Sequence, residues 1–371
     1  MTYTSFFPQQ RTLMGPGPSD ISPQVQLASS KPLVGHLDPQ FLKLMDEIKQ
    51  MLQLAFQTQN ANTFVVSAPG SAGMETCFVN LLEPGDKVIV CINGVFGMRM
   101  KENIERCQAQ AIVVEDPWGS PVSEDKLELA LQQHPDAKCV AFVHAETSTG
   151  VCSDAQALCA IAKRYNCLTI VDAVTSLGGV PLKVDEWQID AVYSGSQKCL
   201  SCIPGLSPVS FSPAAIDVLN ARKVPVQSWF LDHTLVMNYW SSTQKRSYHH
   251  TAPVTSLYAM HEALVQLHHE GLENSWNRHQ QQHMVLRDGL EAMGIEFIVD
   301  PKYRLPQLNT VAIPNGVDDA LIRSRLLNEY NLEIGAGLGA FAGKAWRIGL
   351  MGYAARTENV SLCLAALREV L

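Results

Sequence analysis

The feature that most constrains the fold of this 371-residue chain is a regular alternation of short apolar runs with helix-like segments. The runs lack the period-two polar pattern of a half-exposed strand, so we expect both faces of these strands to be buried. Apolar strands separated by helices are typical of an α/β fold with a mainly parallel sheet. The expected strands are 63–67, 87–92, 111–115, 139–144, 168–172 and 191–194. The expected helices are 41–56, 73–82, 97–108, 123–134 and 155–165.

The last hundred residues have a different rhythm. A long helical pattern runs from about 255 to 293, with a break around Gly271. Short strands are then expected at 296–299, 309–314, 333–334 and 345–349, with helices at 318–331 and from 357. This mixture indicates a smaller α+β domain. We therefore predict an irregular, proline-rich N-terminal arm (1–20), a large domain (21–270) and a small C-terminal domain (271–371).

Composition argues against several classes of protein. The 28 Lys and Arg residues and 36 Asp and Glu residues give a net charge of -8 without a basic run, so we expect no nucleic-acid binding. No stretch of about 18 apolar residues is present, so we expect no membrane span. Residues 1–10 show no secretory signal. The ten cysteines lie in apolar segments and are interpreted as reduced core residues, which favours a cytoplasmic protein.

Two charged residues, Asp172 and Lys198, fall where parallel sheets bind ligands. Asp172 ends the expected strand 168–172, and Lys198 follows strand 191–194 across a three-residue loop. Both therefore lie at the carboxyl edge of the sheet. A lysine that forms an imine, and a carboxylate that keeps a pyridine nitrogen protonated, suit pyridoxal 5'-phosphate. A surface lysine and a helix-capping aspartate are the structural alternative.

Three further segments are candidate anion sites. Small residues at 67–73, between a strand and a helix, let backbone N–H groups approach a phosphate. The same segment would also serve as a helix cap, or as the nucleophile turn of a hydrolase in which Pro69 replaces the first glycine. Arg347, a charge in an apolar strand, suits either a substrate carboxylate or a structural salt bridge. The hydroxyls of Tyr248 and Thr251 could donate to a phosphate or could cap the helix that follows them.

Three other motifs are interpreted as structural. The glycine-rich run at 335–340 fits a dinucleotide fingerprint, but no long helix follows it. Cys199 and Cys202 form a lone C-x-x-C pair without a second pair for zinc. His279 and His283 are spaced i, i+4 but lack the glutamate of a zinc protease, so we expect them on an exposed polar face.

Taken together, five motifs resemble the class V aminotransferases. They are Gly-Pro-Gly-Pro-Ser at 15–19, Val-Asp-Ala-Val at 171–174, Ser-Gly-Ser-Gln-Lys at 194–198, Tyr-His-His-Thr at 248–251 and Arg-Ile-Gly at 347–349. The resemblance runs from about residue 13 to the C-terminus and is strongest to the alanine–glyoxylate (serine–pyruvate) branch. It implies the fold of type I pyridoxal-phosphate transferases, with a mainly parallel seven-stranded sheet and a small α+β domain. It also implies a homodimer with shared active sites and an N-terminal arm that lies over the partner.

The resemblance assigns roles to individual residues. The implied catalytic residues are Lys198, which holds the cofactor, and Asp172, which pairs with its ring nitrogen. The implied cofactor contacts are Gly70, Ser71, Phe96, Thr147, Asp172, Val174, Gln197 and Lys198, with Tyr248 and Thr251 reaching the partner's cofactor. The implied substrate contacts are Gly17, Gly35, Thr147 and Arg347. No metal is implied. The sequence departs from the family at three positions: Phe96 stands where relatives stack tryptophan, Ser71 where many have histidine, and Pro69 removes a backbone donor.

The resulting prediction is transfer of an amino group from alanine or serine to glyoxylate or a similar oxoacid, with pyridoxal phosphate as cofactor. The main alternative is another donor of the same family, such as 3-hydroxykynurenine. Cysteine desulfurase or lyase chemistry is a second alternative, but it needs a mobile cysteine in the small domain, and Cys363 falls on the last expected helix. A protein that binds the cofactor without catalysis is the third.

Overall fold

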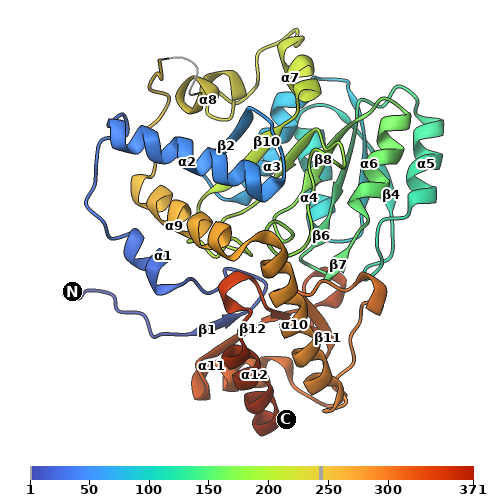
Figure 1. Ribbon diagram of the computed structural model, residues 1–371. Coiled ribbons are helices and arrows are strands. Elements are labelled where there is room, and N and C mark those ends of the chain that lie inside the picture. The colour runs from blue at the N-terminus through green and yellow to red at the C-terminus, as the bar shows by residue number, and fades with distance from the viewer. Residues whose placement is uncertain (1, 242–244) are drawn as a thin grey trace.

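A seven-stranded sheet forms the centre of the protein in the computed structural model, which describes residues 2–241 and 245–371 (Figure 1). Its strands, in spatial order, are β2 (Asn62–Val66), β10 (Ser207–Phe211), β9 (Ala191–Tyr193), β8 (Leu168–Asp172), β5 (Cys139–Val143), β3 (Lys87–Ile92) and β4 (Gln110–Glu115). All neighbours are parallel except β10, which is antiparallel to β2 and β9. The expectation of a mainly parallel α/β sheet is confirmed.

The sheet is covered on both faces, because every residue of β5, β8, β9 and β10 is buried although successive side chains point to opposite sides. The main covering helices are α2 (Pro39–Phe56), α3 (Gly70–Leu81), α4 (Val95–Arg106), α5 (Glu124–Gln133), α6 (Ala155–Arg164) and α9 (Val254–Glu270). Smaller elements on this part of the chain are α1 (Pro23–Ala28), α7 (Pro213–Asn220), α8 (His233–Trp240) and a short hairpin of β6 (Ala145–Glu146) with β7 (Val151–Cys152).

The predicted helix boundaries agree with these elements to within a few residues. The break expected around Gly271 is present: α9 ends at Glu270, and α10 (Leu272–Glu291) starts immediately after it. Gly271 has a φ of 82°, a left-handed conformation that a helix interior does not contain and that glycine adopts readily. The chain therefore changes direction at this residue as it passes to the second sheet.

The second sheet has four strands, in the order β1 (Thr12–Met14), β12 (Leu332–Ala336), β13 (Ala345–Gly349) and β11 (Leu308–Ala312). It packs with α10, α11 (Asp319–Glu329) and α12 (Thr357–Val370), and three short 3₁₀ turns are η1 (Pro301–Tyr303), η2 (Gly339–Phe341) and η3 (Gly352–Ala354). The expected strand at 296–299 is wrong: only an isolated bridge between Phe297 and Val311 forms there.

The N-terminal segment was expected to be irregular, but part of it belongs to this second sheet. Residues 12–14 run parallel to Leu332–Ile334, more than 300 positions away in the chain (Figure 1). Met14 is fully buried in the apolar core that the second sheet and its helices share. This pairing carries the Gly-Pro-Gly-Pro-Ser turn from the small sheet back to the large one. No described helix has the length and apolarity to cross a membrane.

Candidate active site

Asp172 and Lys198 lie together at the carboxyl edge of the large sheet. Asp172 is the last residue of β8 and sits beside Tyr193, the last residue of β9, in the parallel register. Lys198 follows β9 after a short loop, and both charged side chains are buried, with 2% and 7% of their surface exposed. A surface lysine is therefore excluded, and two ionisable groups occupy an interior site at the edge where α/β sheets bind ligands.

Hydrogen bonds hold both carboxylate oxygens of Asp172. The backbone N–H of Val174 donates to Oδ1 at 2.8 Å, and the hydroxyl of Tyr193 donates to Oδ2 at 2.7 Å. Burial raises the pKa of Asp172 to about 6, and the two donors and the positive charge of Lys198 offset part of this effect. A buried carboxylate with this environment is suited to pair with a cationic ring nitrogen.

Lys198 is surrounded by backbone and by a second cation. Burial, followed by the positive charge of Arg347, lowers the pKa of Lys198 to about 8. Its Nζ donates to the carbonyl of Pro16. The adjacent Gly17 has a φ of 101°, and a Cβ built there would lie 2.5 Å from Nζ. Only glycine lets this turn approach the lysine so closely, and an amine of lowered pKa is suited to covalent attachment and to proton transfer.

The segment expected to hold a phosphate forms the start of α3. Gly70 is the first helical residue, and Pro69 before it provides no side-chain cap, so the first backbone N–H groups are open to an anion. Gly70 is buried, whereas Ser71 is exposed, and a Cβ on Gly70 would fill the space 3.4 Å from Val174 and 3.5 Å from Gly195.

Gln197 faces the same cradle. A Cβ on Gly195 would lie 2.8 Å from Gln197 Oε1, and this oxygen is buried without a hydrogen-bond partner among the described residues. Because amide oxygen and nitrogen are interchangeable by rotation, the same group can donate Nε2 to a phosphate. An unpartnered amide beside an uncapped helix start fits a bound phosphate, so the residues present fit pyridoxal phosphate.

Arg347 is a buried cation that is held only by backbone oxygens. Its Nε donates to Ala336 O at 2.8 Å and its Nη1 to Thr147 O at 3.0 Å, and it forms no ion pair with the described part of the chain. Burial lowers the pKa of the guanidinium, with the charge of Glu146 opposing this. A buried guanidinium without a carboxylate partner calls for an anionic ligand.

Three further predicted cofactor contacts, Thr147, Val174 and Phe96, are buried or half-buried. Thr147 Oγ1 lies 2.5 Å from Thr175 Oγ1, and both hydroxyls are buried. Val174 is half-buried next to Gly70. Phe96 is half-buried near the start of α4, and Arg99 lies 4.8 Å from the centre of its ring.

Tyr248, Thr251 and Gly35 are not brought to this cluster. Tyr248 is 58% exposed, and its hydroxyl lies 3.3 Å from Thr251 Oγ1. Its ring packs against His36, 5.0 Å between centroids, next to Gly35, whose surroundings are open. Within the described residues Tyr248 contacts Thr251 and His36, and no hydrogen bond or ring contact joins Tyr248 or Thr251 to Lys198 or Asp172.

Sequence reasoning missed two groups that shape the site. Tyr193 donates to Asp172 from the neighbouring strand, and its signal in the sequence was a hydroxyl at the end of an otherwise apolar strand. Glu146 is fully buried beside the site, and burial raises its pKa to about 7. Its signal was a carboxylate two residues after the expected apolar strand 139–144.

The expectation of an exposed face for His279 and His283 is wrong. Both are buried, because α10 packs against α9 and α12 and contributes Leu286 and Leu290 to the core of the second sheet. His279 Nδ1 lies 2.7 Å from Ser275 O, and its Nε2 accepts the N–H of Gly352 at 2.8 Å. His283 Nδ1 lies 2.6 Å from Asn309 Oδ1. These histidines join α10 to neighbouring segments and are structural.

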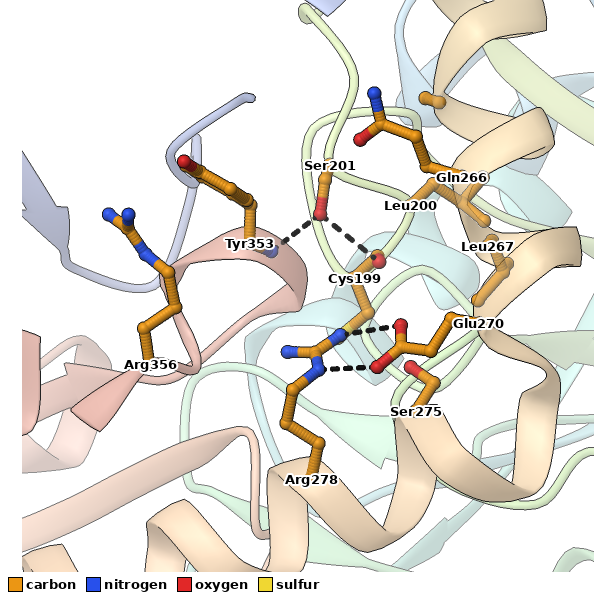
Figure 2. Close-up of a pocket in the computed structure, with 11 residues that line it drawn as sticks. Cys199, Leu200, Ser201, Gln266, Leu267, Glu270, Ser275, Arg278, Tyr353 and Arg356 are labelled. Carbon is orange, nitrogen blue, oxygen red and sulfur yellow. Dashed lines mark hydrogen bonds and ion pairs between the residues drawn. The ribbon is translucent and has the colours of Figure 1, made fainter. Parts of the chain in front are cut away.

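A cavity of about 270 Å³ borders the loop that follows Lys198 (Figure 2). Arg278 and Glu270 pair along one wall at 2.5 Å, and Ser201 accepts the N–H of Tyr353 at 2.7 Å. No predicted cofactor or substrate residue lines this cavity. It lies between α9, α10, the turn at η3 and the loop that follows Lys198.

Comparisons with known proteins identify the family. The sequence model of "Aminotransferase class-V" matches residues 26–361. Alanine–glyoxylate aminotransferase of Rattus norvegicus is 42% identical over 364 residues, which cover 98% of this chain and 88% of that protein. (S)-ureidoglycine–glyoxylate transaminase of Bacillus subtilis is 37% identical, with 97% and 90% covered. The crystal structure of alanine–glyoxylate aminotransferase from Nostoc sp. superposes with a TM-score of 0.97 at 44% identity, covering 100% of this chain and 97% of that one.

Proposed function

The chain belongs to the class V aminotransferases, and we propose that it transfers the amino group of alanine or serine to glyoxylate with pyridoxal 5'-phosphate as cofactor. The observation that carries the proposal is the buried group of Lys198, Asp172 and Arg347, in a chain that is 42% identical to an alanine–glyoxylate aminotransferase over nearly its whole length. The group combines an amine for the cofactor, a carboxylate for its ring and a cation for a substrate carboxylate.

The cofactor would be held at three places. Gly70, Ser71 and Gln197 would bind the phosphate at the start of α3, and Phe96 and Val174 would lie against the two faces of the ring. Asp172 would keep the ring nitrogen protonated. Bound pyridoxal phosphate supplies an electron-withdrawing ring that stabilises negative charge at the Cα of an amino acid.

Lys198 would have two tasks, covalent attachment and proton transfer. Its pKa, lowered to about 8, makes the neutral amine far more populated near neutral pH than in an ordinary lysine, whose pKa is about 10.5. After an amino acid displaces it, Nζ would accept the proton from the substrate Cα, and it would return a proton when the oxoacid is aminated. Its position against Pro16 and Gly17 restricts the movement of Nζ.

Arg347 would bind the carboxylate that amino acids and oxoacids share. The two backbone oxygens fix the guanidinium plane, so the unoccupied edge of the fork is available for a bidentate contact. Thr147, whose carbonyl accepts from Arg347, would place its hydroxyl beside the same substrate. Gly17 and Gly35 would leave room for a small side chain.

The proposed unit is a homodimer, each chain with a large domain at 21–270 and a small one at 271–371. The exposed hydroxyls of Tyr248 and Thr251 support this proposal, because they lie apart from their own Lys198 cluster and would reach the partner's cofactor phosphate. The exposed aromatic residues Tyr3, Phe6 and Phe7 in the N-terminal arm would be covered by the partner.

The test is the visible absorption of the purified protein loaded with pyridoxal phosphate. Addition of L-alanine or L-serine should abolish the band of the covalently attached cofactor, and glyoxylate should restore it. Lys198→Ala should lose the band and all turnover while it keeps the far-ultraviolet circular dichroism of the wild type. A wild type without any band, or a fully active Lys198→Ala variant, would refute the proposal.

Other donors can be distinguished in the same experiment. If (S)-ureidoglycine or 3-hydroxykynurenine abolishes the band and alanine and serine do not, the cofactor assignment stands and the donor assignment fails. Desulfurase chemistry is disfavoured because Cys363, the last cysteine, is fully buried inside α12 and cannot act as a mobile nucleophile.

A further inference from the structure

The first turn of α4 is held by a carboxylate from another part of the chain. Glu146 lies in β6 and has no exposed surface. Its Oε1 accepts the N–H of Ser148 at 3.0 Å and the Ser148 hydroxyl at 2.6 Å. Because that hydroxyl donates to Glu146, its lone pair is left to accept, and it accepts the N–H of Val95 at 2.9 Å.

This chain of bonds replaces an ordinary helix cap. Val95 is the first residue of α4, and Gly94 before it has no side chain to satisfy the free N–H groups. The hydroxyl of Ser148, which follows β6, provides the acceptor for the N–H of Val95. The arrangement also requires glycine at 94, because a Cβ there would lie 2.4 Å from Glu146 Cδ and 2.5 Å from Ser148 Oγ.

Phe96 is the second residue of α4 and belongs to the turn that this cap holds. Phe96 follows Val95 directly, so a shift of the first turn moves its ring. The second oxygen of Glu146, Oε2, is buried without a partner among the described residues. A fully buried carboxylate is costly to keep, and it is compensated by its bonds to Ser148, while the nearby backbone N–H of Gly97 in α4 also favours its charged form.

We propose that Glu146 is a positioning residue that acts through Ser148 to fix the start of α4 and thereby the Phe96 ring against the cofactor. The inference rests on the proposed function, because Phe96 has a ring to stack on only if pyridoxal phosphate binds. It assigns a task to a buried acid that the proposed proton transfers do not use.

The test is a titration of apoprotein with pyridoxal phosphate, followed by visible absorption and visible circular dichroism, which reports the ring environment. Ser148→Ala and Glu146→Ala should each weaken binding about fivefold, as expected for the loss of one helix cap, and should change the dichroic band. Glu146→Gln keeps an acceptor oxygen for Ser148 and should bind within about twofold of the wild type. Ser123→Ala, which removes the cap of α5 away from the site, is the matched control and should bind like the wild type.

A double-mutant cycle tests the route through Phe96. In a Phe96→Ala background, Ser148→Ala should have no further effect on binding or on the dichroic band. An equal weakening with and without Phe96, or wild-type binding by Ser148→Ala, would overturn the inference while the proposed function stands. If Glu146→Ala does not fold, the smaller Ser148→Ala change still decides the question. Failure of the wild type to take up cofactor would overturn the proposed function and this inference together.

Discussion

Removal of one hydroxyl, by Tyr193→Phe, should shift the pH dependence of cofactor binding. Tyr193 has no exposed surface, and its hydroxyl donates at 2.7 Å to Oδ2 of Asp172. The substitution removes one atom and leaves the ring packing unchanged. It therefore tests the hydrogen bond rather than the core.

The expected magnitude follows from the charge on the acceptor. A hydrogen bond to a charged group contributes about 1.5–3 kcal/mol, which corresponds to about one to two pH units for the titration of the acceptor. Burial already raises the pKa of Asp172 to about 6, and Tyr193 and Val174 oppose that rise. Without the hydroxyl the pKa rises further, so Asp172 takes up a proton nearer to neutral pH and loses its attraction for a protonated ring nitrogen.

The assay is the dissociation constant of pyridoxal phosphate at pH values from 5.5 to about 9, measured by visible absorption. For Tyr193→Phe the loss of affinity on acidification should begin at higher pH than for the wild type, whereas affinity at the alkaline end should be similar. Tyr165→Phe, which removes a hydroxyl bonded to Glu128 at 3.3 Å on the outer helix layer, is the matched control. Superimposable pH profiles for Tyr193→Phe and the wild type would refute the reasoning.

Three further predictions concern the same site. Asp172→Asn should raise the stability of the apoprotein at pH 8 by up to ~3 kcal/mol and should have no such effect below pH 4, because burial raises the pKa of this carboxyl from 3.8 to about 6 and its ionisation then opposes folding. Thermal unfolding measured against pH tests this, and a stability gain that is independent of pH would contradict it. Gly17→Ala should prevent covalent cofactor attachment, because its Cβ would overlap Lys198 Nζ, and absorption spectra would show the loss of the band. The control Gly85→Ala, at a φ of 88° but in open space, should lower only the melting temperature. Arg347→Lys should lower kcat/KM for the amino acid at least about 100-fold because a single ammonium cannot form the bidentate contact, with cofactor affinity unchanged; near-normal kcat/KM would show that the carboxylate binds elsewhere.

The sequence alone was sufficient to predict the layered architecture. Runs of residues that are apolar at both odd and even positions require burial on two faces, and this pattern is visible within a few consecutive residues. The same runs located Asp172 and Lys198 at the carboxyl edge, because strand direction in a parallel sheet follows from the order of strands and helices. The break at Gly271 was also visible, since a glycine interrupted an otherwise continuous helical pattern.

Tertiary structure decided the features that depend on distant partners. The strand β10 was not predicted, and its antiparallel pairing with β2 and β9 follows from neighbours that lie far away in the chain. Likewise, residues 12–14 become a strand only because β12 provides a free edge. The burial of His279 depends on how α10 packs, whereas the polar residues around it in the sequence predicted an exposed face.

The chemistry of the site divides in the same way. Its charged residues were evident in the sequence because a lysine or an aspartate at the end of an apolar strand is conspicuous. Their environment was not evident, because the bond from Tyr193 to Asp172 and the link from Glu146 to the start of α4 each join residues from different elements. The unpartnered amide oxygen of Gln197 likewise results from burial in the folded chain. Burial and hydrogen bonding set the pKa values and orientations of these groups, and both quantities exist only after the chain has folded.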